Sequence, residues 1–373
     1  MRILHVVRQY IPTRGGLEAY VMNLCAQQRA QGLCPSVLTL DRMFHKRDVR
    51  LPHYETIDGV SVLRIPFVGG RRLFLPRLDP KPLSGFDIVH MHGIDPLCDA
   101  VCLAKPLFGV TLVLTTHGGF FHTRDYALQK KIYFNTISRF TLGRADAVIA
   151  CSTSDQVMLR RIGIATTVVR NAVVPLPPRD ECGRDMLYIG RLAANKRVDK
   201  LLSFAACLRE RAADAPRLHI IGEDHDRILG DLRRQVCELG LGNVVTIHGY
   251  VAPDDLGRII RACRFFVSAS RYEGFGMSLV EAMCAGLVPF VHANDAFREL
   301  LVDADAGCLA NFDHPETCAD QFVAWCAGLD DAAHDRAREF GMRFSWEQLS
   351  SAVLALYRQV AGTRGRSGQM CGV

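Results

Sequence analysis

Residues 271–281 read RYEGFGMSLVE, and they follow an apolar run at 265–268. The apolar run predicts a buried strand, and the glycines allow a tight turn from that strand into a helix. At the start of such a helix, the N–H groups of Gly276, Met277 and Ser278 point at an anion with the helix dipole behind them. A strand, a glycine turn and a helix in this order predict an α/β fold with a phosphate site.

Two carboxylates flank this turn. Glu273 comes before the predicted helix, and Glu281 lies about two turns into it. We therefore expect one carboxylate to face a reacting group and the other to reach a different part of the same ligand. The alternative is a plain strand–turn–helix unit, in which Glu273 is solvated and Glu281 lies on a wet helix face.

Size and composition predict two domains and a globular protein. A chain of 373 residues is too long for one ordinary core, and 49% hydrophobic with 23% charged residues is a soluble composition. No secretory signal opens the chain, and its most apolar region, 96–115, is interrupted by Asp99 and Lys105. We expect a cytoplasmic protein.

The cysteines and histidines do not predict a metal site. The 14 cysteines are scattered singly, so we expect buried thiols rather than bridges or zinc ligands, for example at Cys25, Cys34, Cys151, Cys207 and Cys263. His90 and His92 flank Met91 and suggest a metal at first sight. Alternation of side chains at a strand end explains this spacing more simply.

Charge is distributed unevenly along the chain. The net charge is +6, but residues 1–175 carry 22 Lys and Arg against 12 Asp and Glu, and the remainder carries 23 against 27. A basic first half is suited to binding nucleic acid, anionic lipid or a phosphate-bearing substrate. No nucleic-acid-binding motif supports the first of these three partners.

Strand-like runs alternate with helical segments throughout the first half. This alternation predicts a parallel, doubly wound sheet with ligands at the carboxyl ends of its strands. We expect strands at 2–7, 36–40, 60–65, 87–90, 111–115 and 146–151, the last of this half. Gly15 and Gly16 follow the first strand but lack a full dinucleotide fingerprint, so a simple turn remains possible. His117 ends the fifth strand and is followed by two glycines, which favours a functional loop over a structural histidine.

The segment 124–144 interleaves aromatic and basic residues. It reads as a basic amphipathic helix, and its cations include Arg124, Lys130 and Lys131. Such a helix either packs its aromatics on its own sheet or rests on an anionic membrane. Residues 71–77 add further cations and apolar side chains for the same contact.

The second half begins after a proline-rich linker at 174–180. Strands are expected at 186–189, 218–222 and 244–247, in addition to 265–268. Arg191 and Lys196 follow the first of these and suit a diphosphate, because Arg offers a planar fork and Lys a point charge. Asp254 and Asp255 suit either helix caps or acceptors for the N–H edge of guanine.

The two glutamates with seven residues between them, including the glycine turn, resemble the retaining GT-B glycosyltransferases of family 4. The segments 4–9, 39–42, 57–59, 89–93, 116–123 with 130–132, and 271–285 further resemble the α-mannosyltransferases of the xanthan and acetan pathways. Those enzymes add mannose from GDP-mannose to a cellobiose linked by diphosphate to a polyprenol. The resemblance covers nearly the whole chain.

This resemblance implies a GT-B fold, in which two Rossmann-like domains face each other across a cleft. The acceptor domain would span 1–172, with a C-terminal helix at 346–360 packing back on it. The nucleotide-sugar domain would span 173–345, and 361–373 would form a loose tail. Glu273 and His117 would be catalytic, with His117 beside the donor sugar. Gly15 and Gly16 would face the donor's diphosphate, and Tyr250 and Val251 would lie along the base.

We therefore expect a membrane-associated α-1,3-mannosyltransferase that uses GDP-mannose, needs no metal and works by same-face substitution. The alternatives are a family 4 transferase using UDP-glucose or UDP-N-acetylglucosamine, and a non-catalytic nucleotide-sugar-binding protein. Three positions depart from the family pattern: Ala172 and the pair Glu223-Asp224, which affect the nucleotide pocket, and Arg197 in place of a common glycine. Arg197 suggests a differently shaped loop after Lys196.

Overall fold

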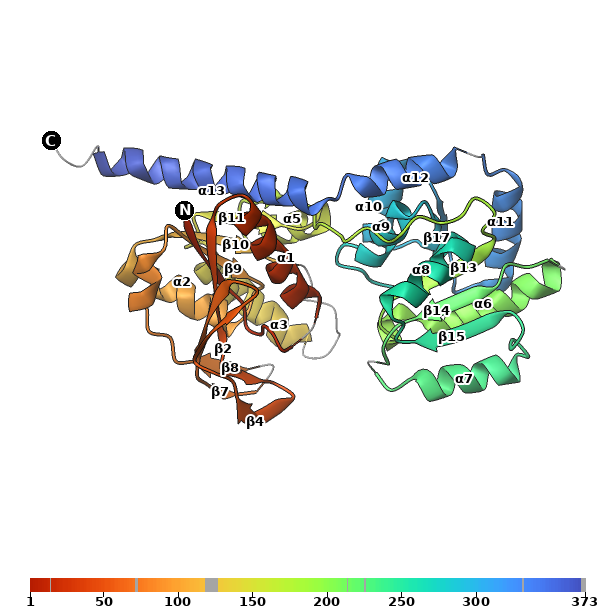
Figure 1. Ribbon diagram of the computed structural model, residues 1–373, viewed down its shortest axis with the longest axis horizontal. Coiled ribbons are helices and arrows are strands. Elements are labelled where there is room, and N and C mark those ends of the chain that lie inside the picture. The colour runs from red at the N-terminus through yellow and green to blue at the C-terminus, as the bar shows by residue number, and fades with distance from the viewer. Residues whose placement is uncertain are drawn as a thin grey trace. The chain divides into compact units, whose positions relative to one another are not determined.

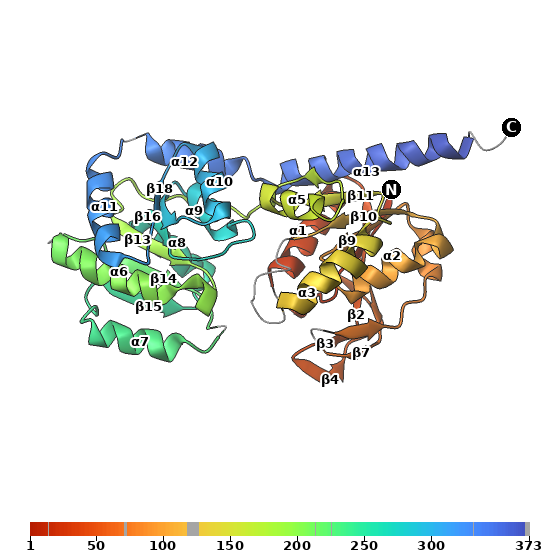
Figure 2. The ribbon, with the colours of Figure 1, turned by 180° about the vertical axis from the view of Figure 1, so that it is seen from behind.

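The computed structural model describes residues 1–13, 15–70, 73–117, 127–212, 214–224, 226–330 and 332–369. The chain divides into two compact units, drawn in Figures 1 and 2. The first unit comprises Met1–Arg170 and Trp346–Val373, and the second comprises Asn171–Ser345.

The first unit is built on an eight-stranded sheet in the order β12-β11-β10-β9-β1-β2-β6-β5. All neighbours in it pair in parallel except β5, which is antiparallel to β6 because a tight turn at 58–59 joins the two. The strands are β1 (Arg2–Val6), β2 (Cys34–Leu40), β5 (Tyr54–Ile57), β6 (Val60–Ile65), β9 (Ile88–His92), β10 (Thr111–Thr115), β11 (Ala147–Ala150) and β12 (Thr167–Val168). The prediction that 146–151 ends this sheet is wrong, because β12 adds one short strand that carries no apolar run.

Two hairpins and a set of helices complete this unit. The hairpins pair β3 (Arg42–Met43) with β4 (Lys46–Arg50), and β7 (Phe67–Gly69) with β8 (Phe74–Pro76). The helices are α1 (Gly16–Ala30), α2 (Pro96–Phe108), α3 (Ala127–Tyr133), α4 (Arg139–Leu142), α5 (Thr153–Arg160) and α13 (Trp346–Gln369), with a π-helical turn at Phe134–Ser138 and a 3-10 turn at Lys81–Gly85. Helix α13 ends at Gln369, nine residues past the end expected at 360. The glycines of this added segment make it a weak helix former, but no proline interrupts it, so the helix continues.

The second unit is built on a six-stranded parallel sheet in the order β15-β14-β13-β16-β17-β18. Its strands are β13 (Asp185–Ile189), β14 (Leu218–Ile221), β15 (Val245–Gly249), β16 (Cys263–Ser268), β17 (Val288–His292) and β18 (Cys308–Ala310). Its helices are α6 (Val198–Arg211), α7 (Leu229–Glu238), α8 (Pro253–Ala262), α9 (Met277–Cys284), α10 (Asp295–Ala304), α11 (Pro315–Ala327) and α12 (Ala333–Met342), with a 3-10 turn at Ala194–Lys196.

Each sheet is covered on both faces, so the apolar runs lie inside. One apolar cluster in the first unit and two in the second contain the side chains of the central strands and of the helices beside them. The described cysteines are all free, as expected, but Cys34 is exposed and Cys207 half-buried, because both lie at the margins of their units. Among the described residues, no helix is long and apolar enough to cross a membrane.

Candidate active site

The glycine turn at the end of β16 has the geometry that its sequence predicts. Gly276 precedes α9 with φ 98° and ψ 42°, a conformation that favours glycine. A Cβ atom at this position would lie 3.1 Å from Phe297 Cε1 and 3.2 Å from Leu300 Cδ1. Both the backbone conformation and the space around it therefore call for glycine.

Helix α9 begins with unsatisfied backbone donors. The N–H groups of Leu279 and Val280 both donate to the Gly276 carbonyl, at 3.0 and 3.1 Å. Helix geometry gives the preceding N–H groups, those of Gly276, Met277 and Ser278, no partner within the helix. Within the described residues they meet no other backbone acceptor either. The result is a cluster of donors at the positive end of a helix, suited to an anion.

Glu273 and Lys196 form an ion pair beside this turn. The Lys196 ammonium lies 2.7 Å from both carboxylate oxygens of Glu273, and each side chain is 15% exposed. A hydrogen bond of 3.2 Å from the Arg271 N–H to the Asn195 carbonyl joins the two loops that carry them. Two predicted site residues are thus brought together, and in the free protein they neutralise each other.

Arg191 lies near the same pair. Its backbone carbonyl accepts a hydrogen bond of 3.1 Å from the hydroxyl of Tyr188, on β13. Burial raises the pKa of Tyr188, the charge of Glu273 raises it further, and the charge of Arg191 opposes both. The charges of Glu273 and Arg191 thus act on the pKa of Tyr188 in opposite directions, and the Tyr188 hydroxyl fixes the backbone of the loop that carries Arg191.

Glu281 has a different environment from Glu273. It is partly buried on α9, and burial raises the pKa of its carboxyl from 4.5 to about 7. No hydrogen bond or ion pair joins it to another described residue. The two carboxylates of the motif thus differ in kind: one is paired and the other is desolvated without a partner.

A shallow hollow lies beyond the end of β15. It is lined by His248, Tyr250, Val251, Ala252, Asp255, Arg258 and Ile259. Tyr250 is 74% exposed, which leaves its ring free for stacking. Asp255 forms an ion pair with Arg258, and helix α8 is preceded by Ala252 without a side-chain cap. The expectation that Asp255 caps α8 is therefore wrong, and the side chain of Asp254 lies outside the described residues.

In the first unit, Gly15 and Gly16 lie at the start of α1. Gly15 has φ −161°, an extended conformation open to any residue, and a Cβ atom at Gly16 would meet nothing within 4 Å. The protein's own packing at Gly16 thus leaves open space where a ligand has room to approach the backbone.

His117 follows β10 with φ 57°. Its ring lies edge-on to the Tyr20 ring of α1, with 4.4 Å between centroids. His117 Nε2 lies 3.0 Å from His92 Nδ1, His92 Nε2 lies 2.9 Å from His5 Nδ1, and His5 Nε2 lies 2.8 Å from Gln28 Oε1. A hydrogen-bonded chain therefore runs from the predicted catalytic histidine into the core.

A fourth histidine of this cluster is held separately. His90 Nδ1 lies 2.6 Å from the Tyr357 hydroxyl of α13, and its Nε2 lies 2.7 Å from Thr115 Oγ1. His5, His90 and His92 are close enough to hold a metal ion. However, every ring nitrogen of these three already has a hydrogen-bond partner, so a metal would have to replace several of those bonds.

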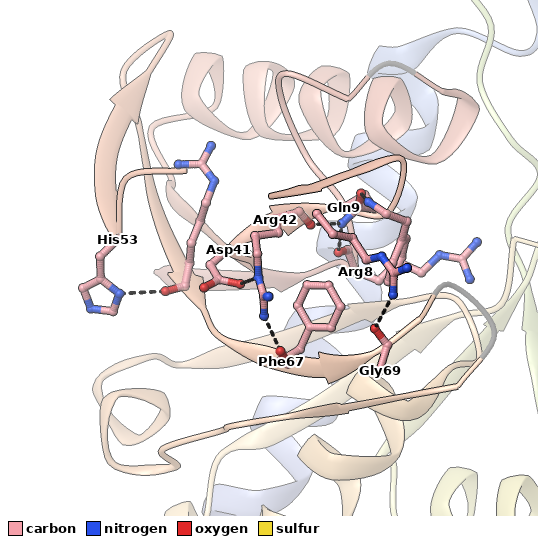
Figure 3. A network of polar contacts seen from close by, with 10 residues as sticks. Arg8, Gln9, Asp41, Arg42, His53, Phe67 and Gly69 are labelled. Carbon is pink, nitrogen blue, oxygen red and sulfur yellow. Dashed lines mark hydrogen bonds and ion pairs between the residues drawn. The ribbon is translucent and has the colours of Figure 1, made fainter. Parts of the chain in front are cut away.

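Polar side chains also gather where β1, β2 and β6 end (Figure 3). Gln9 donates to the carbonyls of Arg8 and Arg42, at 2.9 and 3.0 Å, and the Arg42 guanidinium bonds Asp41 at 3.0 Å. Arg42 also donates to the Phe67 carbonyl. Arg8, Gln9, Asp41 and Arg42 belong to the segments 4–9 and 39–42, which carry part of the resemblance to the α-mannosyltransferases.

The predicted basic helix is present in part. Arg124 and the side chain of Lys130 lie outside the described residues, whereas Lys131 is exposed on α3. Phe134 is buried in the core, and Tyr133 bonds to Asp99 of α2. Other apolar side chains face outward, with exposed fractions of 69% for Leu128, 56% for Ile132, 49% for Ile137 and 58% for Phe140, and Leu103 and Leu107 of α2 are exposed as well. We call these six apolar residues, with Lys131 and Arg139, the α3–α4 surface.

The departures from the family pattern have structural explanations. Arg197 takes φ 52° and ψ 46°, the left-handed conformation that glycine favours, so the loop does not need a new shape to hold an arginine. Asp224 accepts hydrogen bonds from the Ile228 and Leu229 N–H groups. Ala172 is fully buried.

Sequence reasoning missed the partners of His117. His5 lies on β1 in register with His90 on β9, and His92 follows on the same face of β9. The available signal was a histidine in each of two predicted strands, His5 in 2–7 and His90 in 87–90, whose pairing the sequence did not predict.

Comparisons with known proteins show which family the chain resembles. The model for glycosyltransferase family 4 matches residues 14–175, and the model for glycosyl transferases group 1 matches residues 177–334. The chain is 32% identical to the GDP-mannose:cellobiosyl-diphosphopolyprenol alpha-mannosyltransferase of Xanthomonas campestris, over 97% of this chain and 98% of that protein. The protein of the same name from Komagataeibacter xylinus is also 32% identical, over 97% and 94% of the two chains.

Solved structures show the same fold. Sucrose-phosphate synthase from Thermosynechococcus elongatus superposes with a TM-score of 0.74 at 19% identity, covering 97% of this chain and 99% of its own. A glycosyltransferase from Rickettsia africae gives 0.71 at 17% identity, with 96% and 98% covered. The predicted GT-B class, with two Rossmann-like sheets, is confirmed. Because identity of 32% extends over nearly the full length of two mannosyltransferases, the chain is a glycosyltransferase and belongs to family 4.

Proposed function

We propose that the protein is a retaining α-mannosyltransferase that moves mannose from GDP-mannose to a cellobiosyl-diphosphopolyprenol, forming an α-1,3 linkage. The names of its near-full-length relatives support the choice of donor and acceptor. One observation carries the transfer chemistry: Lys196, on the loop after β13, is paired with Glu273, on the loop that leads into the α9 N-terminus, and Arg191 belongs to the first of these loops.

The reaction exchanges one bond at the anomeric carbon of mannose. The bond to the donor's diphosphate breaks, and the bond to the acceptor oxygen forms on the same face. The departing phosphate oxygen takes the proton of the acceptor hydroxyl. Arg191, Lys196 and the donors at the start of α9 stabilise the negative charge that grows on the diphosphate. Because two cations and a helix terminus compensate this negative charge, we propose that no metal is required.

Donor binding then involves an exchange of partners. Lys196 is neutralised by Glu273 in the free protein, so the diphosphate must take the ammonium from the carboxylate. Glu273 becomes available to the sugar at that moment. Glu281, which has no such partner, accepts hydrogen bonds from donor hydroxyls. Tyr250 and Val251 contact the base, and Asp255 accepts from the N–H edge of guanine.

We further propose that the enzyme works on the cytoplasmic face of the membrane, as a peripheral protein. The acceptor is a lipid, and the α3–α4 surface combines exposed apolar side chains with Lys131 and Arg139. Each cation near an anionic surface contributes roughly 1 kcal/mol, screened beyond a Debye length of about 8 Å. Binding should therefore be reversible and sensitive to salt.

The decisive experiment incubates the purified protein with labelled GDP-mannose, UDP-glucose or UDP-N-acetylglucosamine and synthetic cellobiosyl-diphosphopolyprenol. We expect label in the lipid product from GDP-mannose alone, and almost none with Glu273→Gln. Transfer from a UDP-sugar would overturn the mannose assignment. Donor binding without turnover, in the presence of acceptor, would instead indicate a non-catalytic binding protein.

The membrane proposal has a matched test. Lys130→Glu with Lys131→Glu should weaken sedimentation with anionic vesicles and slow transfer to the lipid acceptor. Arg160→Glu with Arg161→Glu makes the same change in net charge at α5 and should change neither. Equal loss in both double variants would show that net charge, and not the α3–α4 surface, drives binding.

A further inference from the structure

The hydrogen bonds that link Gln28, His5, His92 and His117 all run in one direction. Burial lowers the pKa of His5 to about 4 and that of His117 to about 3, and it also lowers the pKa of His92. Each ring is therefore neutral near pH 7. A neutral imidazole has one nitrogen that donates and one that accepts, so the state of one ring determines the next.

Gln28 fixes this direction at the inner end of the chain. Its Oε1 accepts from His5 Nε2–H, and this bond raises the pKa of His5 against the larger effect of burial. An amide oxygen can only accept, and Gln28 Oε1 lies 2.8 Å from His5 Nε2, so His5 Nε2 carries the proton of this bond.

The remaining protons follow from this assignment. His5 Nδ1 has no proton and accepts from His92 Nε2–H. His92 Nδ1 in turn has no proton and accepts from His117 Nε2–H. His117 Nδ1 is then left with a lone pair and has no partner among the described residues. His117 as a residue is only partly buried, so Nδ1 is the ring nitrogen that a ligand would engage.

We propose that His5 and His92 are positioning residues, which hold His117 in its Nε2–H tautomer so that Nδ1 accepts a hydrogen bond from a hydroxyl group of the donor sugar. The proposal rests on the proposed function, which makes a hexose the group that is transferred. The ring of Tyr20 fixes the same imidazole from the side, at 4.4 Å and an interplanar angle of 76°. The tautomer and the orientation of His117 are thus both set before a ligand binds.

His90 provides a matched control within the same cluster. His90 is as buried as His92, and the two rings are 4.2 Å apart. Its hydrogen bonds, however, go to Tyr357 and Thr115 and not to the series that links Gln28 to His117. A purely structural role would make the two histidines equivalent. A positioning role requires only His92 to control His117.

The first test reads the tautomer directly by NMR of the protein with 15N-labelled histidine, and His117→Ala assigns the signal among the 13 histidines. We expect a protonated Nε2 and an unprotonated Nδ1 for His117 in the parent and in His90→Asn. In His92→Leu the Nε2 proton should no longer be fixed. A protonated Nδ1 in the parent would overturn the proposal, as would equal effects of the His90 and His92 variants. This measurement needs no turnover, so its failure is distinguishable from failure of the proposed function.

The second test uses GDP-mannose analogues that each lack one sugar hydroxyl. In the parent, one analogue should lose about tenfold in kcat/KM, the order expected for one hydrogen bond. In His92→Leu that same analogue should lose little further, and His92→Asn should restore part of the discrimination, because its Oδ1 can replace Nδ1 as the acceptor. An unchanged penalty in His92→Leu would overturn the proposal. So would stoichiometric metal in the purified parent that is lost from His5→Ala.

Discussion

Glu281 gives the sharpest test of how the second unit binds its donor. Burial raises the pKa of this carboxyl from 4.5 to about 7 in the free protein. If donor hydroxyls donate to the carboxylate, they favour the charged form and return the pKa toward its ordinary range. Donor binding must then release a proton from Glu281 whenever the pH lies near or below 7.

The size of this effect follows from the pKa. A group with a pKa of about 7 is roughly 10% ionised at pH 6 and roughly 90% ionised at pH 8. The Kd for GDP-mannose should therefore fall about tenfold between these pH values, equivalent to about 1.4 kcal/mol. At pH 7, about half a proton should be released for each donor bound.

The assay is titration calorimetry with GDP-mannose at pH 6, 7 and 8, repeated in two buffers of different ionisation enthalpy. GDP itself is unsuitable, because a terminal phosphate ionises near pH 6 and adds its own pH dependence. Two histidines of the second unit, His248 and His292, have pKa values lowered from 6.5 by burial, so they are neutral over most of this pH range. Glu281→Gln should bind with the same Kd at all three pH values.

Two results would refute this reasoning. A Kd for the parent that does not change with pH would mean that Glu281 does not contact the donor. A Kd that rises with pH would mean that the protonated carboxyl donates to the ligand, the reverse of the role proposed. If GDP-mannose does not bind at all, the substrate assignment fails, and the protonation argument then applies to the true donor.

Four further predictions follow. Glu281→Gln should stabilise the free protein by about 3 kcal/mol at pH 8 and not at pH 4. The raised pKa of Glu281 contributes stability that is present below pH 4.5 and is lost as the pH rises through about 7. Urea unfolding at both pH values measures the difference in stability. Gly276→Ala should destabilise by about 1–3 kcal/mol in thermal melts, whereas Gly16→Ala, with open space around it, should be nearly neutral. Glu273→Gln should bind the donor at least as tightly as the parent in calorimetry, yet lose about 100-fold or more in kcat. Chelator should leave the initial transfer rate within about twofold, and a rate abolished by chelator and restored by magnesium would contradict metal independence.

The sequence predicted the central strands of both sheets because these are continuous apolar runs between turns. It did not predict β17, whose second residue is Pro289, a residue type that argues against an interior strand. It also missed β5, β12 and β18, which are two to four residues long, too short for a pattern. Local sequence thus determines the longer strands that read as unbroken apolar runs, whereas strands of two to four residues, and β17 with its proline, depend on tertiary pairing.

The candidate site divides in the same way. The α9 turn was predictable because its chemistry lies in one short segment, where glycine spacing and helix geometry place the donors. The Lys196–Glu273 pair joins residues 77 positions apart, and the bond between them depends on how two loops meet. The His117 chain draws on α1, β1, β9 and the loop after β10, so its direction depends on one amide of Gln28 that no motif identifies.

The Lys196–Glu273 pair also explains why one glutamate is paired and the other is not. A free carboxylate at position 273 would repel an incoming diphosphate, and a free ammonium at 196 would hold stray anions. Bonded at 2.7 Å, the two present little net charge until a ligand offers each a better partner. The diphosphate competes for Lys196, so part of the donor's binding free energy is used to release Glu273 beside the sugar. Glu273→Gln removes that competition, which is why tighter binding with lower turnover is expected, and weaker binding would mean that Glu273 holds the donor directly in the ground state.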